Sequence, residues 1–261
     1  MVCRAGHKIK MPVEKRYVAR LAIAILVSVG IAALCPKIIG DIPASIPLLI
    51  KWVFIPAGSM IPVSTVIYTC FGDLLFCYLF SDFLDDGVSY SAIHVLSRSV
   101  SRFGWFARRL GSIATYLMLY VACRDVLMAV AGGISASLGA IAFVSSVILL
   151  DFLMMTVLMV AIFLFGTVLS SIASYLAIAC AHLISLCFFA SLTPEIAESV
   201  ARVLPSVQGV YAIHGHVGLT LADGLQVDMV GLGYSYIYLA LLSFILLFAL
   251  WVRFSKRDFY N

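Results

Sequence analysis

Residues 140–163 read AIAFVSSVILLDFLMMTVLMVAIF and contain one charged residue, Asp151. An α-helix rises about 1.5 Å per residue, so a hydrocarbon core of about 30 Å needs about 20 apolar residues to cross it. This stretch is therefore long enough to cross a membrane as a helix. It predicts that the protein is built around membrane-spanning helices.

The composition of the whole chain agrees with that stretch. Of the 261 residues, 63% are apolar and 11% are charged, and the mean hydropathy is +1.11. Soluble domains carry about 45–50% apolar and about 25% charged residues. The composition therefore excludes a soluble globular enzyme, a disordered chain and a nucleic-acid-binding protein.

Six apolar runs divide the chain, and we expect one all-α membrane domain over 1–261 with about six transmembrane helices. Cys35-Pro36-Lys37 closes the first run, and the density of prolines after it predicts an outer loop. Phe165-Gly166-Thr167 alone separates the fourth run from the fifth, which predicts a tight turn, although another division of 134–192 stays open. The runs are residues 18–35, 60–80, 111–131, 140–163, 170–192 and 233–252.

The basic residues predict which side of the membrane each connection occupies. Thirteen of the seventeen Lys and Arg residues lie near the N-terminus, in segment 81–109 or near the C-terminus. Cytoplasmic connections of membrane proteins carry an excess of Lys and Arg. We therefore expect segments 1–17, 81–109 and 253–261 to be cytoplasmic and 193–232 to be an outer loop.

Few ionisable residues fall within the predicted spans, and such residues often mark substrate or ion paths. Asp73, Asp151 and His182 are the candidates for a substrate path, but Asp151 also fits a polar packing residue near the outer end of its span. His182 also fits a hydrogen-bonded core histidine. Arg124 and Asp125 are expected near the outer interface with partners on other helices, because adjacent helical residues do not face one another.

No known enzymatic pattern is complete in the sequence. His214 and His216 alternate without a nearby Cys or carboxylate, which is a weak metal pattern. The seven cysteines show no CxxC or zinc spacing and fit small buried apolar residues. There is also no Gly-x-x-x-x-Gly-Lys loop, so we expect no ATP hydrolysis on this chain and no catalytic, cofactor-binding or metal-binding residue.

Segment 81–109 is the most polar part of the chain and predicts a docking surface for a soluble partner. Arg98, Arg102, Trp105 and Arg109 follow at helical spacing and share one face. Arg108 and Arg109 are expected to reach toward anionic lipid headgroups.

The same segment resembles a motif of the type 2 ABC exporter permeases, especially the small single-domain bacterial ones. That motif has an acidic residue, a Gly, an aromatic residue and then an Arg-x-x-Ser-Arg-x-x-Trp-like run entering the third span. Val100 stands where a Gly commonly precedes the Ser-Arg pair. The matching residues here are Asp86, Gly87, Tyr90, Arg98, Ser101, Arg102 and Trp105.

The resemblance implies a permease subunit of an ATP-driven exporter in the plasma membrane, with both termini cytoplasmic. Residues 83–97, with Asp85 and Asp86 near their start, would form a coupling helix that contacts the ATPase. The partners would be two ABC ATPase subunits that bind ATP and Mg, and a second permease chain in a homodimer or heterodimer. In this family the outer loop forms short helices, and Thr193-Pro194-Glu195 fits the start of one. The cargo would be a peptide, a lipid or an amphipathic drug-like molecule.

Two other function classes remain open from the residues themselves. An ATP-independent secondary transporter, or a small integral partner subunit, would be favoured by an essential Asp73 or Asp151. A lipid-modifying membrane enzyme would require a divalent metal on Asp82, Asp85 or Asp86.

Overall fold

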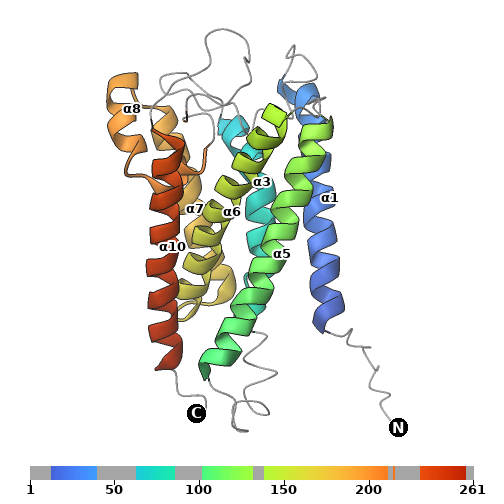
Figure 1. The fold of residues 1–261 in the computed structure, drawn as a ribbon, viewed down its shortest axis with the longest axis vertical. Helices are drawn as coiled ribbons and strands as arrows, with labels where there is room; N and C mark the ends of the chain where they lie inside the picture. Colours follow the sequence, from blue (N-terminus) through green and yellow to red (C-terminus); the bar gives the residue numbers. More distant parts are fainter. Residues whose placement is uncertain are drawn as a thin grey trace, which may run out of the picture.

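The computed structural model describes residues 13–39, 63–85, 102–131, 138–210, 214 and 230–256. All regular structure in these residues is helical. Six long helices run alongside one another, and two short helices lie together at one end of the bundle (Figure 1). The long helices are α1 (Val13–Ile39), α3 (Val63–Phe80), α5 (Arg102–Ala131), α6 (Leu138–Gly166), α7 (Ser171–Ala190) and α10 (Leu232–Ser255); the short ones are α8 (Pro194–Ala201) and α9 (Pro205–Gln208).

Four of the described helices are long and apolar enough to cross a membrane, namely α5, α6, α7 and α10. They are compatible with a multi-pass membrane protein. The predicted spans 111–131, 140–163, 170–192 and 233–252 correspond to these four helices. α5 begins at Arg102, nine residues before its predicted start. The arginine-rich last part of segment 81–109 is therefore the first part of this helix.

The predicted runs 18–35 and 60–80 lie within helices α1 and α3. α1 continues past Pro36 to Ile39, so the prediction that this proline closes the helix is wrong. In apolar surroundings a helix tolerates proline when neighbouring groups replace the lost hydrogen bond. The number of membrane crossings that α1 and α3 add stays a prediction.

The tight turn predicted between the fourth and fifth spans is confirmed. α6 ends at Gly166, and α7 begins at Ser171. The Ser170 side chain accepts a hydrogen bond from the Ala173 N–H at 3.3 Å, which satisfies a donor that the first turn of α7 leaves free. Four residues are therefore enough to reverse the chain between two long helices.

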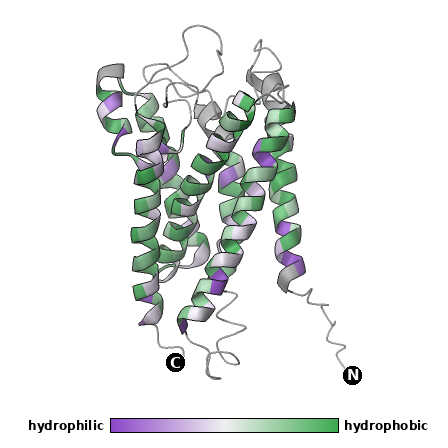
Figure 2. Ribbon diagram, in the orientation of Figure 1, coloured by the Kyte–Doolittle hydropathy of each residue, from purple (hydrophilic) through white to green (hydrophobic). Residues whose placement is uncertain are grey.

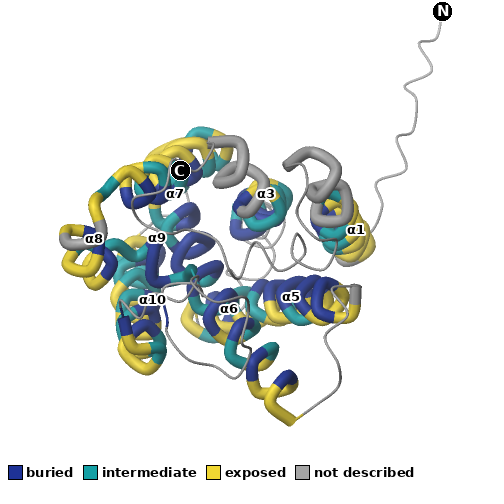
Figure 3. The backbone as a smooth tube through the Cα atoms, turned by 90° about the horizontal axis from the view of Figure 1, so that it is seen from above, coloured by how far each residue is buried: buried dark blue, intermediate teal, exposed yellow. Residues whose placement is uncertain are grey.

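α6 occupies the middle of the bundle. It packs against α5, α7 and α10 and has the largest buried share of the four candidate spans (Figure 3). Its apolar residues surround the whole helix, as expected of a helix enclosed by others. α10 packs mainly on α6 and is exposed over most of its surface.

The other helices join the bundle through aromatic rings. Phe76 of α3 stacks on Tyr120 of α5 with ring centroids 4.6 Å apart, and also on Phe80 at 4.4 Å. Tyr17 of α1 meets the Phe83 ring edge-on at 4.7 Å. These contacts fix α1, α3 and α5 against one another near one end of the bundle.

Hydrophilic residues colour the ribbon near the end of the bundle where α1 begins and α10 ends (Figure 2), and most of the described basic residues of the long helices lie there. We call it the basic end. The other end of the bundle carries α8 and α9, where Arg202 pairs with Glu198 at 2.6 Å. The described residues of the basic end are Lys15, Arg16, Arg20, Arg102, Arg108, Arg109, Arg253 and Lys256.

Gly72 allows α1 and α3 to approach closely. A Cβ atom at this position would lie 2.6 Å from Ser28 Oγ, 2.9 Å from Ser28 Cβ and 3.0 Å from the Tyr120 hydroxyl. Ser28 Cβ is fixed to the backbone, so the serine cannot avoid the clash by rotating its side chain. The helices would have to separate.

We expect Gly72→Ala to lower the free energy of unfolding by about 1–3 kcal/mol, the usual cost of overpacking. Gly111→Ala on α5 is the matched control, because nothing lies within 4 Å of a Cβ there. The free energy of unfolding of that variant should rise by up to about 1 kcal/mol, because alanine favours the helix more than glycine does. Thermal unfolding of both purified variants measures the difference, and equal melting temperatures would show that α1 and α3 do not meet at Gly72.

Candidate functional site

A buried arginine on α5 gathers three carboxylates inside the bundle. The Arg124 side chain is 1% exposed. Its Nε donates to Asp125 Oδ1 at 2.7 Å, Nη1 donates to Asp73 of α3, and Nη2 donates to Asp151 of α6. We call these four residues the Arg124 cluster. One guanidinium therefore ties three helices together through charge-assisted hydrogen bonds.

A second layer of contacts extends the cluster to α1. The Arg124 guanidinium lies 5.0 Å from the centroid of the Tyr120 ring, which favours a cation above its face. The Tyr120 hydroxyl is 2.9 Å from Ser28 Oγ, and Ser28 Oγ donates to the Ala24 carbonyl at 2.6 Å. The polar groups of four helices thus meet in one continuous network.

The structure brings together ionisable residues that the sequence could only name separately. The expectation that Arg124 has partners on other helices is confirmed by Asp73 and Asp151. The expectation that adjacent residues do not face one another is wrong for this pair, because Arg124 Nε donates to Asp125 Oδ1. Asp151 lies near the middle of α6 and not near its end. There the Arg124 guanidinium compensates the charge of the Asp151 carboxylate.

His182 does not join the Arg124 cluster. It lies on α7, is buried, and its Nδ1 is 3.0 Å from Ser206 Oγ of α9. This is the hydrogen-bonded core position that the sequence offered as the alternative to a substrate path. His182 therefore holds α9 against α7.

His214 lies between the backbone carbonyls of two segments. Its Nδ1 is 2.8 Å from the Val230 oxygen, and its Nε2 is 3.2 Å from the Gln208 oxygen. Both ring nitrogens are therefore engaged by the protein, and His216 lies outside the described residues. In the part of the chain that the structure describes, no three His, Cys, Asp or Glu side chains are placed so that they could hold a metal ion together.

Three residues of the predicted coupling surface are described, and each contacts this chain. Asp85 accepts a hydrogen bond from Ser171 Oγ at 2.6 Å, at the start of α7. Arg102 donates to the carbonyl of Ser255 at 3.1 Å, at the end of α10. The other predicted coupling residues, Asp86, Gly87, Tyr90, Arg98 and Ser101, lie outside the described residues.

Trp105 is directed into the bundle. Its side chain is 8% exposed, and its ring stacks on Phe254 of α10 with centroids 5.4 Å apart and planes 5° from parallel. The spacing of Arg102, Trp105 and Arg109 correctly predicted a shared helix face. On that face Trp105 is buried against α10 and Arg109 is half-buried, whereas Arg102 stays exposed.

Further contacts at the basic end were not predicted. Arg20 of α1 forms an ion pair with Asp82 at 2.5 Å and also donates to the Leu79 carbonyl at 2.7 Å. Arg109 donates to the Phe83 carbonyl at 3.1 Å and lies 4.3 Å from the centroid of the Phe83 ring. Arg109 is half-buried and bonded within this chain, just beyond the end of α3, and its expected contact with lipid headgroups stays a prediction. The only sequence sign of these contacts was the position of the charges at span ends.

Known proteins give one point of comparison. No curated protein and no solved structure matches the chain. A family model described as a protein of unknown function, DUF2705, matches residues 51–260, which include α3 and every later helix. Because this match covers most of the sequence, the chain belongs to the DUF2705 family.

Proposed function

We propose that this chain is the transmembrane permease subunit of an ATP-driven ABC exporter. It would form the path of a peptide, lipid or amphipathic drug-like cargo across the plasma membrane. Six helices would cross the membrane, and two separate ATPase subunits would bind ATP and Mg. A second permease chain, identical or related, would complete the path.

The arrangement of the two ends of the bundle is the observation that carries this proposal. The start of α1, the end of α3, the start of α5 and the end of α10 all lie at the basic end (Figure 1). The positive-inside rule then favours a cytoplasmic basic end. The short helices α8 and α9 lie at the opposite end, before the last long helix, as the resemblance implies. α8 begins at Pro194 after the N-cap Thr193, as the sequence predicted.

The contacts around segment 81–109 supply a route for coupling. Its described residues are bonded to α1 through Arg20, to α7 through Ser171 and to α10 through Ser255. A partner that pulled on this segment would therefore displace several helices as one body. ATP-driven closure can bias the permease only through a contact that differs between its two states.

The first test is purification of the tagged full chain in a mild detergent after co-expression with its chromosomal neighbours. We expect a soluble subunit with a phosphate-binding loop to co-purify in stoichiometric amount and to hydrolyse ATP. A chain that purifies alone and shows no ATPase activity would contradict the proposal.

A charge reversal then tests the docking segment. Asp86→Lys, or Arg98→Glu, should lower the amount of co-purified ATPase by at least about tenfold, because like charges facing one another at an interface cost several kcal/mol. Arg202→Glu, at the opposite end of the bundle, is the control and should retain the ATPase. Full retention by the two segment variants would show that the ATPase docks elsewhere.

An ATP-independent secondary transporter, or a small integral partner subunit, is the second candidate, and the Arg124 cluster favours it. Buried ionisable residues in a membrane often lie on an ion or substrate path. On this alternative, transport continues without any ATPase and is lost in Asp73→Asn or Asp151→Asn. A lipid-modifying enzyme is less well supported, because Asp82 and Asp85 are already bonded to Arg20 and Ser171.

A further inference from the structure

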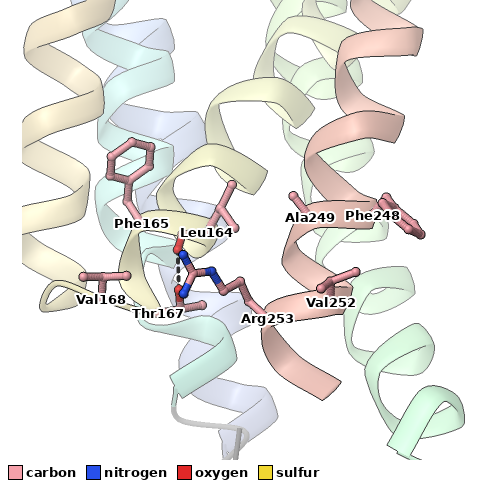
Figure 4. A pocket seen from close by; sticks show the side chains of 8 residues that line it. All are labelled: Leu164, Phe165, Thr167, Val168, Phe248, Ala249, Val252 and Arg253. Carbon is pink, nitrogen blue, oxygen red and sulfur yellow. Dashed lines mark hydrogen bonds between the residues drawn. The ribbon is translucent and has the colours of Figure 1, made fainter. Parts of the chain in front are cut away.

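An apolar groove opens between α6 and α10 near the basic end. Its volume is about 530 Å³. α10 lines one side with Phe248, Ala249 and Val252, which share one helix face, and Leu164 and Val168 line the other side (Figure 4). Ala249 has the smallest side chain of the lining residues. Grooves of this size with an apolar lining are typical of ligand sites.

One charged residue stands at the rim of the groove. Arg253 is the only charged side chain among the described residues that line it, and its side chain is directed from α10 toward the turn at Thr167 (Figure 4). Arg253 lies in the last turn of α10 and is exposed. About 7.5 Å of helix separates it from Phe248 at the far end of the lining. The groove thus has an apolar length and a cationic end.

We infer that this groove binds an anionic phospholipid of the surrounding bilayer. One acyl chain lies between α6 and α10, and the phosphate of the headgroup contacts the Arg253 guanidinium. Because α6 and α10 are both candidate membrane spans, a groove between them would face acyl chains, and its charged rim lies at the basic end, where the positive-inside rule places the cytoplasmic headgroups. The inference goes beyond the proposed exporter and requires only that these helices lie in a membrane.

Charge complementarity favours an anionic lipid over a neutral one. A guanidinium binds phosphate through paired N–H groups, and each basic residue near a membrane surface adds about 1 kcal/mol of attraction to anionic lipid. A zwitterionic lipid would fill the same groove with its chain but would neutralise Arg253 less well. We therefore expect a preference of about fivefold for the anionic headgroup.

The test is native mass spectrometry of the full-length protein titrated with phosphatidylglycerol or with phosphatidylcholine of identical acyl chains. The wild type should bind one phosphatidylglycerol about fivefold more tightly than one phosphatidylcholine. Arg253→Gln should remove this preference, and Arg253→Lys should keep most of it. Lys15→Gln is the matched control, since Lys15 is exposed at the start of α1, near the same end of the bundle, but does not line the groove.

A second variant tests the position of the acyl chain. Ala249→Phe fills the hollow and should weaken the binding of both lipids by a similar factor. Soluble glycerol phosphate, which has the anionic group without the chains, should not displace the bound lipid. The inference is overturned if Arg253→Gln keeps the preference, if Lys15→Gln loses as much of it, or if Ala249→Phe binds lipid as the wild type does.

Discussion

Replacing Arg124 by leucine is expected to lower the free energy of unfolding by about 3–5 kcal/mol, the largest loss among the variants considered. The guanidinium is 1% exposed and compensates Asp73, Asp125 and Asp151 together. Leucine removes that charge and leaves three carboxyl groups in the interior of the bundle. A buried carboxylate without a cationic partner costs more than the ion pair contributed. Unfolding of the purified variant by increasing fractions of SDS in mixed micelles measures the loss.

Three companion variants separate charge from packing. Arg202→Leu breaks an exposed pair with Glu198 and should change stability by no more than about 1 kcal/mol. Arg124→Lys keeps the charge but cannot reach three carboxylates at once, so an intermediate loss is expected. Arg124→Leu combined with Asp→Asn at all three partners should recover part of the stability. If Arg124→Leu unfolds at the same SDS fraction as Arg202→Leu, the Arg124 cluster does not hold the helices together.

The sequence predicts the helices well because hydropathy is a local property. The apolar run 140–163 lies within α6, and the turn after Gly166 follows from the short interruption there. Each ionisable member of the Arg124 cluster was also identified from its position in an apolar run. Their grouping was not, because it depends on how α3, α5 and α6 rotate against one another. One of the two interpretations of Asp151 placed it near the outer end of its span, whereas it lies near the middle of α6 and pairs with Arg124.

The basic end shows a different limit of sequence reasoning. The sequence correctly predicted that Arg102, Trp105 and Arg109 share a helix face. It did not predict that these residues contact α10 and Phe83 of the same chain. Charged residues at a span end fit a docking surface, a lipid contact or a contact within the chain equally well. Arg102 donates to the Ser255 carbonyl at the end of α10, where unpaired acceptors remain, and Arg109 donates to the Phe83 carbonyl just beyond α3. Such acceptors are invisible in a hydropathy profile.

The two charged regions lie at different depths along α5, which carries both Arg102 and Arg124. The Arg124 cluster connects α3, α5 and α6 inside the bundle, whereas Asp82, Asp85 and Arg102 connect α1, α7 and α10 to the basic end. A displacement of segment 81–109 would therefore act on helices that the Arg124 cluster holds at one point. This geometry suits a pivoting motion of rigid helices, which is the motion that the proposed exporter requires.

Variants of Trp105 test whether the start of α5 packs against α10 or binds a partner. We expect Trp105→Ala to lower the free energy of unfolding by about 3 kcal/mol, because it removes a buried ring that stacks on Phe254. Trp105→Phe should retain most of the stability, since a smaller ring can still stack. Phe103→Ala is the control on the same helix, because Phe103 is 62% exposed. This variant should lose no more than about 1 kcal/mol of unfolding free energy.

Two measurements on the same samples separate the two roles of Trp105. SDS unfolding reports the packing contact, and the amount of co-purified ATPase reports docking. A packing role predicts that Trp105→Ala and Phe254→Ala lose stability non-additively, with a coupling of about 0.5–1.5 kcal/mol for an aromatic pair. It also predicts that Trp105→Phe keeps the ATPase bound. If Trp105→Ala unfolds like the wild type but no longer retains the ATPase, Trp105 faces the partner and the stacking on Phe254 does not stabilise the helix pair.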